Sequence, residues 1–525
     1  MTWKRTAVLI SLLIWLIPLT GLGQDQPAQG KSLSLTLDDC ILRALKNNLS
    51  IKVAEFSPKL SEESLSGAQA QYMPTMSFGY TPGRSENASF SWLDTAGTSV
   101  FTDSQTYNGS INELTPLGGR FTISIDGSRT HTNQRATTVD PRYSANLRFS
   151  YSQPILRNFG VATTNRNITI ARNNLESSEI SFYKSVQDTV YSVIQAYWNL
   201  FYSIDNLKVQ QLGLQLSKDL LEKNRRSVEI GTLAPMDVLT AEADVASREA
   251  SILAAEASVK SNEDNLKNLI NLSPDEEKGL RDIVALDQPK FEEQKMELDQ
   301  ALKIAMANRP DLKISQISLK NTDISLRYAK NQLLPDLSLN ATWRSPGLSG
   351  TQLIYDNPLT GNLVGTVPGQ GTQAWKDAFG FKYANWSLGL TLNINVSDYL
   401  TRAAYAQAKL NMDQALESMK LQEQQVILEI RNAVRSLQTS YKQVQAYKLA
   451  RELAEKKYQN EQEKLRVGQS TDYFVLQYLR DLTSARVLEL NAIINYNVAI
   501  AGLDRSMGVL LEKKNIKLED IGSEK

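Results

Sequence analysis

The sequence predicts a mainly α-helical chain with a smaller membrane β component, built from two copies of one plan. Residues 37–78 align without a gap on residues 298–339, and 13 of the 42 paired residues are identical. Leucine or valine then recurs every seven residues from Leu200 to Val228, a period that marks helices packed as coiled coils. Between the helical blocks the apolar period falls to two, which is typical of strands.

Composition excludes several classes of protein. The 57 lysines and arginines equal the 57 aspartates and glutamates in number, so no excess positive charge favours nucleic acid. Cys40 is the only cysteine and His131 the only histidine. Triads that need histidine and zinc sites made of cysteine and histidine are therefore excluded. We expect no enzyme activity, cofactor or metal; a carboxylate pair acting on envelope glycans is the one enzymatic alternative left.

The N-terminus reads as a secretory signal. Lys4 and Arg5 precede an apolar run over residues 7–17, and Pro18 and small residues follow. This order predicts a signal peptide over residues 1–23. No later segment approaches the roughly eighteen consecutive apolar residues of a membrane helix, so any membrane segment must consist of strands.

The repeat sets the predicted boundaries, because a second block matches at an offset of 237 and pairs Gly231 with Gly468. Each copy should contain short helices, a β-hairpin and a long helical hairpin. The first repeat is expected over 24–272, with its β-hairpin at about 76–156 and its helical hairpin at 161–272. A linker over 273–297 follows, then the second repeat over 298–509 (β-hairpin about 335–397, helical hairpin 398–509) and a tail over 510–525.

The long helices should form rods that end in two similar tips. Residues 161–230 contain no proline, and a helix of that length reaches roughly 100 Å. Gly231 and Gly468 follow apolar residues and fit left-handed helix caps. Thr232, and Ser470 or Thr471, suit the start of each returning helix. Arg451 interrupts the apolar seam of the second copy, which predicts a looser or wetter contact there.

Four strands are expected in each chain. Alternating residues from Trp386 to Val396 and from Tyr143 to Tyr151 are apolar, and weaker partners lie at 121–125 and 337–343. The pattern fits outer-membrane barrel strands, with a soluble sheet that has one dry face as the alternative. Four strands cannot close a barrel alone, so two or three chains must share one. An extra short hairpin within 76–118 is left open.

The chain resembles the TolC family of outer-membrane efflux and secretion channels. The carriers are the duplicated plan, "ANRPDL" at 307–312, "LLPDLSL" at 333–339, "SQPILRNFG" at 152–160 and the "VG" tip of the second copy. The resemblance implies a homotrimer with a twelve-stranded barrel in outer-membrane lipid and an α-helical tunnel through the periplasm. It also implies a belt around the tunnel made by the short helices, the linker and the tail.

The resemblance further implies partners and site residues. The tips would dock a periplasmic adaptor that connects the channel to an inner-membrane transporter supplying the energy. The docking residues would be Ile230, Gly231, Thr232, Leu233, Arg466, Val467, Gly468, Gln469, Ser470 and Thr471. Where the family carries an acidic ring at the periplasmic entrance, this sequence has Phe474 and Gln477, so we expect these residues and Asp472 to narrow the mouth by bulk and polarity.

Three further residues carry expectations. Arg148 should face the lumen, where it either biases selectivity or pairs with a neighbour. His131 should be solvated in an outer loop over 131–142, and Cys40 should be packed in a short helix. The competing function is a non-conducting periplasmic coiled-coil scaffold or cell-surface receptor that uses the rods as spacers. The sequence leaves the exported substrate and the pump class open.

Overall fold

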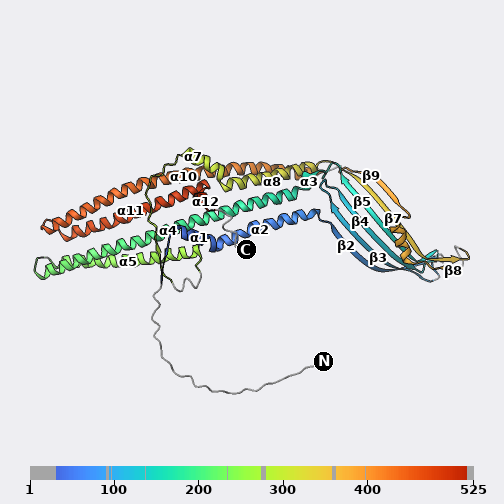
Figure 1. Ribbon diagram of the computed structural model, residues 1–525, viewed down its shortest axis with the longest axis horizontal. Coiled ribbons are helices and arrows are strands. Elements are labelled where there is room, and N and C mark those ends of the chain that lie inside the picture. The colour runs from blue at the N-terminus through green and yellow to red at the C-terminus, as the bar shows by residue number, and fades with distance from the viewer. Residues whose placement is uncertain are drawn as a thin grey trace, which may run out of the picture.

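The computed structural model describes residues 31–516, except positions 90, 92–93, 96, 136, 233, 273–279, 358–361 and 396–397. The molecule is elongated, with long helices at one end and a tilted sheet at the other (Figure 1). The predicted signal peptide, tip residue Leu233, strand residue Val396, the start of the linker and the end of the tail lie outside the described residues.

The duplicated helical plan is confirmed. The first copy contains α1 (Leu37–Asn47), α2 (Leu49–Gln69), the short η1 (Ala70–Tyr72), α3 (Val161–Thr164), α4 (Arg166–Glu229) and α5 (Pro235–Ile270). The second contains α7 (Leu298–Asn308), α8 (Pro310–Gln332), α10 (Tyr399–Arg466), α11 (Asp472–Met507) and α12 (Leu510–Lys513). With 64 and 68 residues, α4 and α10 are each about 100 Å long. None of the helices in the described ranges is both long and apolar enough to cross a membrane.

A belt half-way along the helices packs the two copies together, because its core contains residues of α4 from the first copy and of α11 and α12 from the second. Here β1 (Lys31–Leu35) pairs in parallel with β6 (Leu280–Ala285), a two-stranded sheet that the sequence analysis missed. The buried hydroxyl of Tyr197 on α4 donates to the Leu35 carbonyl oxygen at 3.3 Å, which ties this sheet to the rod. Cys40 is fully buried in the same core, as expected, and burial raises the pKa of its thiol to about 12.

The sheet contains more strands than predicted. The strands are β2 (Thr75–Ala88), β3 (Ser99–Leu114), β4 (Arg120–Thr132), β5 (Val139–Pro154), β7 (Asp336–Tyr355), β8 (Leu363–Val367) and β9 (Asn385–Asn393). They pair antiparallel in the order β2-β3-β4-β5-β7, and β9 and β8 pair with successive lengths of the remaining edge of β7.

The expected contribution of four strands to a twelve-stranded barrel was therefore too small. Four strands already come from the first copy, because the region 76–118 forms the complete β2–β3 hairpin. The sequence pattern did not predict this hairpin, because β2 contains Pro82 and Gly83 and few apolar residues in its outer half. The described sheet has seven strands, of which β8 pairs only with the outer end of β7.

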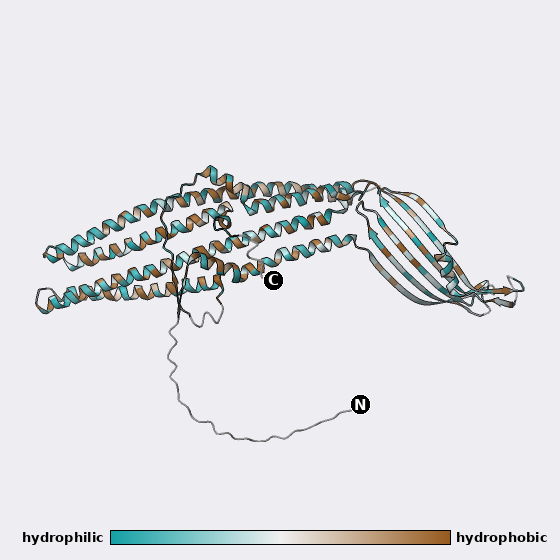
Figure 2. Ribbon diagram, in the orientation of Figure 1, coloured by the Kyte–Doolittle hydropathy of each residue, from teal (hydrophilic) through white to brown (hydrophobic). Residues whose placement is uncertain are grey.

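Apolar and polar residues alternate along the strands, as predicted (Figure 2), so the two faces of the sheet differ in polarity. Cross-strand partners share a face. One face therefore carries Phe78, Ile125, Leu147, Trp343 and Leu390, and the other carries serine, threonine, asparagine and arginine side chains. The apolar face stays exposed along β9, where Trp386 is 79 % exposed. An exposed apolar sheet face of this size belongs in lipid.

Two local expectations change. His131 lies in strand β4 and not in a loop, and its Nδ1 is 2.7 Å from an Asp140 carboxylate oxygen, although the ring is still partly exposed. Arg451 does not loosen the second rod. Its guanidinium donates to Glu455 on α10 and to Glu489 on α11, so an ion-pair cluster replaces the apolar contact.

Candidate functional site

The helices α4 and α10 end at the two tips with the same backbone cap. After α4, Gly231 has a positive φ of 78° and donates to Val228, while the Thr232 amide donates to Ser227. After α10, Gly468 has a φ of 76°, and the same two hydrogen bonds recur from Gly468 and Gln469. This is the Schellman arrangement, which needs a left-handed residue and therefore favours glycine. The predicted glycine caps are confirmed.

The hydroxyl groups at the tips act differently from the expectation. The Thr232 hydroxyl donates to the Ser227 carbonyl oxygen, and the Ser470 hydroxyl donates to Glu461, so both fasten the turn to the preceding rod. The returning helices begin without a side-chain cap, at Ala234 before Pro235 and at Thr471 before Asp472. Ile230 and Val467 project at the two tips and are 76 % and 59 % exposed.

The three residues predicted to narrow the entrance separate into two groups. Phe474 and Gln477 are exposed on α11, and Phe474 packs edge-on against its exposed neighbour Tyr473. Asp472 is buried, so it does not present its carboxylate to a pore. Burial raises the pKa of Asp472; nearby Lys223 partly offsets this, and Asp237 of the first tip adds to it. Tyr473 was missed because only family positions were considered.

A buried charged cluster joins the two helical hairpins above the tips. One carboxylate oxygen of Asp244 accepts from Ser217 and Arg248, and the other accepts from Arg480 on α11. Burial acts to raise the pKa of Asp244, but the hydrogen bonds from Arg248, Ser217 and Arg480 hold it below its ordinary value. The carboxylate therefore stays charged and links α5 to both α4 and α11.

Arg148 lies on the polar face of the sheet. Its cross-strand partners are Ser124 on β4 and Arg344 on β7, so two guanidinium groups from the two repeats lie directly opposite each other. Opposite residues in an antiparallel pair are roughly 5 Å apart at their Cβ atoms, where like charges repel. Asp126 lies on the same face of β4, two residues along the strand from Ser124. The sequence analysis missed Arg344 because register decides which arginines meet.

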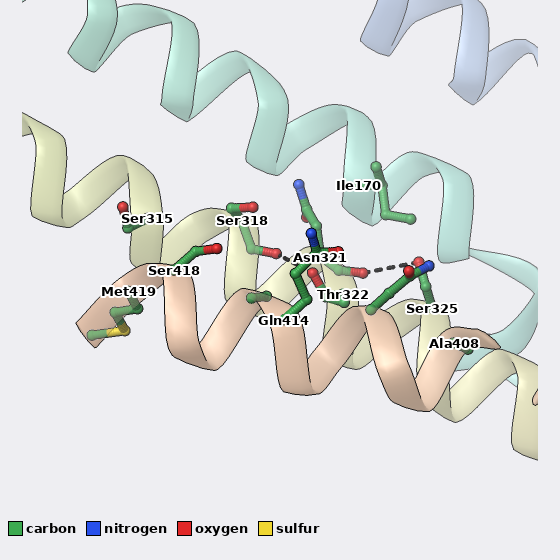
Figure 3. Close-up of a pocket in the computed structure, with 12 residues that line it drawn as sticks. Ile170, Ser315, Ser318, Asn321, Thr322, Ser325, Ala408, Gln414, Ser418 and Met419 are labelled. Carbon is green, nitrogen blue, oxygen red and sulfur yellow. Dashed lines mark hydrogen bonds between the residues drawn. The ribbon is translucent and has the colours of Figure 1, made fainter. Parts of the chain in front are cut away.

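One recess among the rods offers no reactive chemistry. It opens between α4, α8 and α10 with a volume of about 490 Å³ and is lined by serine, threonine and amide side chains (Figure 3). Asn321 spans the recess wall and bonds to Asn173 at 2.7 Å and Asn174 at 3.0 Å. No ionisable side chain lines it, and no group of metal-binding side chains occurs among the described residues.

Comparisons with known proteins give a consistent result. The family described as outer membrane efflux protein matches residues 40–272 and 301–509. The CmeC outer membrane channel of Campylobacter jejuni superposes with a TM-score of 0.64 at 16 % identity, covering 92 % of this chain and 90 % of CmeC. The outer membrane protein VceC of Vibrio cholerae gives 0.62 at 15 % identity, covering 90 % of this chain and 96 % of VceC. CusC gives 0.63 at 13 % identity, covering 93 % and 95 %.

No curated protein sequence matches the chain. At identities this low, the structural likeness establishes the fold, and the family assignment rests on the sequence match over both repeats. That match covers well over half of the chain and contains both tips. The chain therefore belongs to the outer membrane efflux protein family, as a non-enzymatic channel protein of the outer membrane whose helices extend into the periplasm.

Proposed function

We propose that three copies of this chain form one continuous export conduit, the outer-membrane channel of a tripartite efflux pump or a type I secretion system. Small molecules or proteins would pass through it passively, down a path that the subunits enclose together. The proposal rests on one observation: each chain has two unsatisfied lateral edges that continue from the sheet into the helices.

One edge consists of β2 and the preceding α2, and the other consists of β9 and the following α10. Within the described sheet, β2 pairs only with β3, and β9 pairs only with β7. Exposed apolar side chains extend both edges, at Val53, Phe56 and Leu60 on α2 and at Leu410 and Leu421 on α10. Open strand edges are not tolerated in lipid, and a head-to-tail ring of copies satisfies both edges together.

The strand count sets the width of the conduit. Leaving out β8, six strands of each chain run through the apolar band, so three copies would close an eighteen-stranded barrel. Barrels of sixteen to eighteen strands enclose an aqueous channel. The polar face, with Arg148 and Arg344, would then line the lumen, and the apolar face would contact lipid.

The tips are the proposed docking surface for a periplasmic adaptor that leads to an inner-membrane transporter. Ile230 and Val467 are apolar and exposed, and the turns that follow α4 and α10 lie at the end of the molecule away from the sheet (Figure 1). The pair Ile230→Asp and Val467→Asp should abolish cross-linking to the adaptor while single-channel conductance in planar bilayers stays unchanged. Undiminished cross-linking would remove the tips from the docking surface.

The entrance is proposed to narrow at Phe474 and Gln477, with Tyr473 beside them. Replacing the exposed ring in Phe474→Ala should raise conductance, because it removes bulk from the narrowest point. Gln424, an amide on α10 far from the tips, supplies a matched control as Gln424→Ala. An unchanged conductance in Phe474→Ala would show that the constriction lies elsewhere.

The competing function is a non-conducting scaffold or receptor. A scaffold would be removed from membranes by carbonate and would conduct no ions in planar bilayers. The proposed channel should stay in the membrane, migrate as a heat-sensitive trimer in SDS and conduct ions. A strictly monomeric detergent-solubilised form with an intact sheet would refute the proposal.

A further inference from the structure

Helix α9 (Gly371–Phe379) lies near the outer end of the sheet (Figure 1) and contacts β5 and β7 on the apolar face. Ala374 and Ala378 are buried against Ala145 and Tyr143 of β5. Two glycines make this close approach possible, since a Cβ atom on Gly347 would collide with the α9 backbone and one on Gly127 with the Trp375 ring. The helix is thus seated on the face that contacts lipid.

Strand geometry places α9 at the outer rim of the membrane. Gly347 lies eleven residues after the first residue of β7, which is ~36 Å along the strand. A strand tilt of about 45° reduces this to roughly 25 Å of height, which is the height of the apolar band of such barrels. Phe379, Phe381 and Tyr383 are exposed here, as aromatic residues are at membrane interfaces.

A groove begins beneath α9 and runs across the lipid face. Trp375 forms its wall, and Ile123, Ile125, Tyr107, Ile111 and Phe78 form much of its floor. Its volume is about 660 Å³, and no aspartate, glutamate, lysine, arginine or histidine lines it. Phe78 is only three residues from the start of β2, so the groove descends from the rim into the hydrocarbon layer.

We propose that this groove binds an acyl chain of an outer-membrane lipid, with α9 holding the lipid at the interface. The groove is continuous with the exposed apolar face, so the molecules that reach it are lipids. In the proposed ring a neighbouring copy would pair with the free edge of β2 and so lie beside the groove, not over it. The inference rests on the location in the outer membrane and not on the conducting function.

Native mass spectrometry of the detergent-solubilised trimer tests the proposal, with dipalmitoyl phosphatidylethanolamine added after delipidation. The wild-type trimer should retain the lipid at stoichiometric levels. Trp375→Ala removes the groove wall, and Gly109→Leu fills the floor, where an added side chain would lie against the Phe78 ring. Each variant should bind the lipid at least tenfold more weakly.

Leu339→Ala is the matched control, because Leu339 lies on the same apolar face, on β7 between β5 and β9, outside the groove. It should retain the lipid as the wild type does. Heat-sensitive migration in SDS checks that each variant is assembled, and conductance should be the same in all four proteins. Equal lipid retention in all four would overturn the proposal, as would retention of detergent or of a second trimer at this face in place of lipid.

Discussion

The two helical hairpins, α4–α5 and α10–α11, share one geometry but differ in how they place charge. Lys218 pairs with Glu249 at 2.9 Å in the first, and Glu455 pairs with Arg486 at 3.0 Å in the second. Both residues of the second pair lie 237 positions after their counterparts in the first, with the signs exchanged. The backbone thus fixes where two side chains meet, and the sign of each charge is free to vary.

Buried charge separates the hairpins more sharply. Asp244 and Arg248 are buried in the first, where they form an ion pair at 2.8 Å. Their counterparts are Asp481, which is exposed, and Ala485. The second hairpin instead has the partly exposed Arg451 cluster, at the position that Leu214 occupies in the first. The first hairpin therefore has a buried ion pair at a position where the second hairpin has none.

The largest expected effect comes from removing the buried carboxylate that only the first hairpin has at this position. Asp244→Ala leaves the buried Arg248 guanidinium without its partner and should destabilise the first hairpin by about 3–5 kcal/mol. Asp481→Ala, at the matching exposed position, should cost less than about 0.5 kcal/mol. Hydrogen exchange of the α5 amides measures the first effect, and that of the α11 amides measures the second. Equal exchange in the two variants would mean that the cluster does not stabilise the rod.

The next prediction concerns the seam where the repeats meet in the sheet. Replacing Arg148 and Arg344 together by glutamine removes two positive charges per chain from the polar face. The ratio of chloride to potassium permeability, from reversal potentials in a salt gradient, should fall roughly twofold or more. Arg129→Gln on the opposite face is the control and should leave the ratio unchanged. An unaltered ratio in the double variant would place these arginines outside the lumen.

The smallest expected effect compares two carboxylates with opposite pKa shifts. The pKa of Asp472 is raised, so its burial is unfavourable at neutral pH and this penalty disappears as pH falls through the raised pKa. Asp472→Asn should therefore stabilise the tips at pH 7 by on the order of 0.5 kcal/mol, with the gain vanishing near pH 4.

Asp244 should behave in the opposite way. Its lowered pKa means that its stabilisation is present above the ordinary carboxyl pKa and is lost as pH falls through the lowered value. Proteolysis of the tips across a pH series in the two single variants separates the effects. Parallel pH profiles would contradict the assigned environments.

Local patterns along the chain determine much of this protein by themselves. The seven-residue period from Leu200 and the glycines at 231 and 468 are enough to predict the rods and their caps, because helix packing and left-handed caps depend on short-range chemistry. The alternation around Trp386 is enough to predict an amphipathic strand for the same reason.

Tertiary structure decided what depends on distant partners. The β2–β3 hairpin and the β1–β6 pair became visible only through their partners, since strand pairing joins residues whose own pattern is weak. Register and packing between segments far apart in the chain place Arg148 opposite Arg344 and bury Asp472. They also decide that α9 packs on the apolar face of the sheet. A linear period carries no information about these relations, because it specifies which face a residue occupies but not what lies across from it.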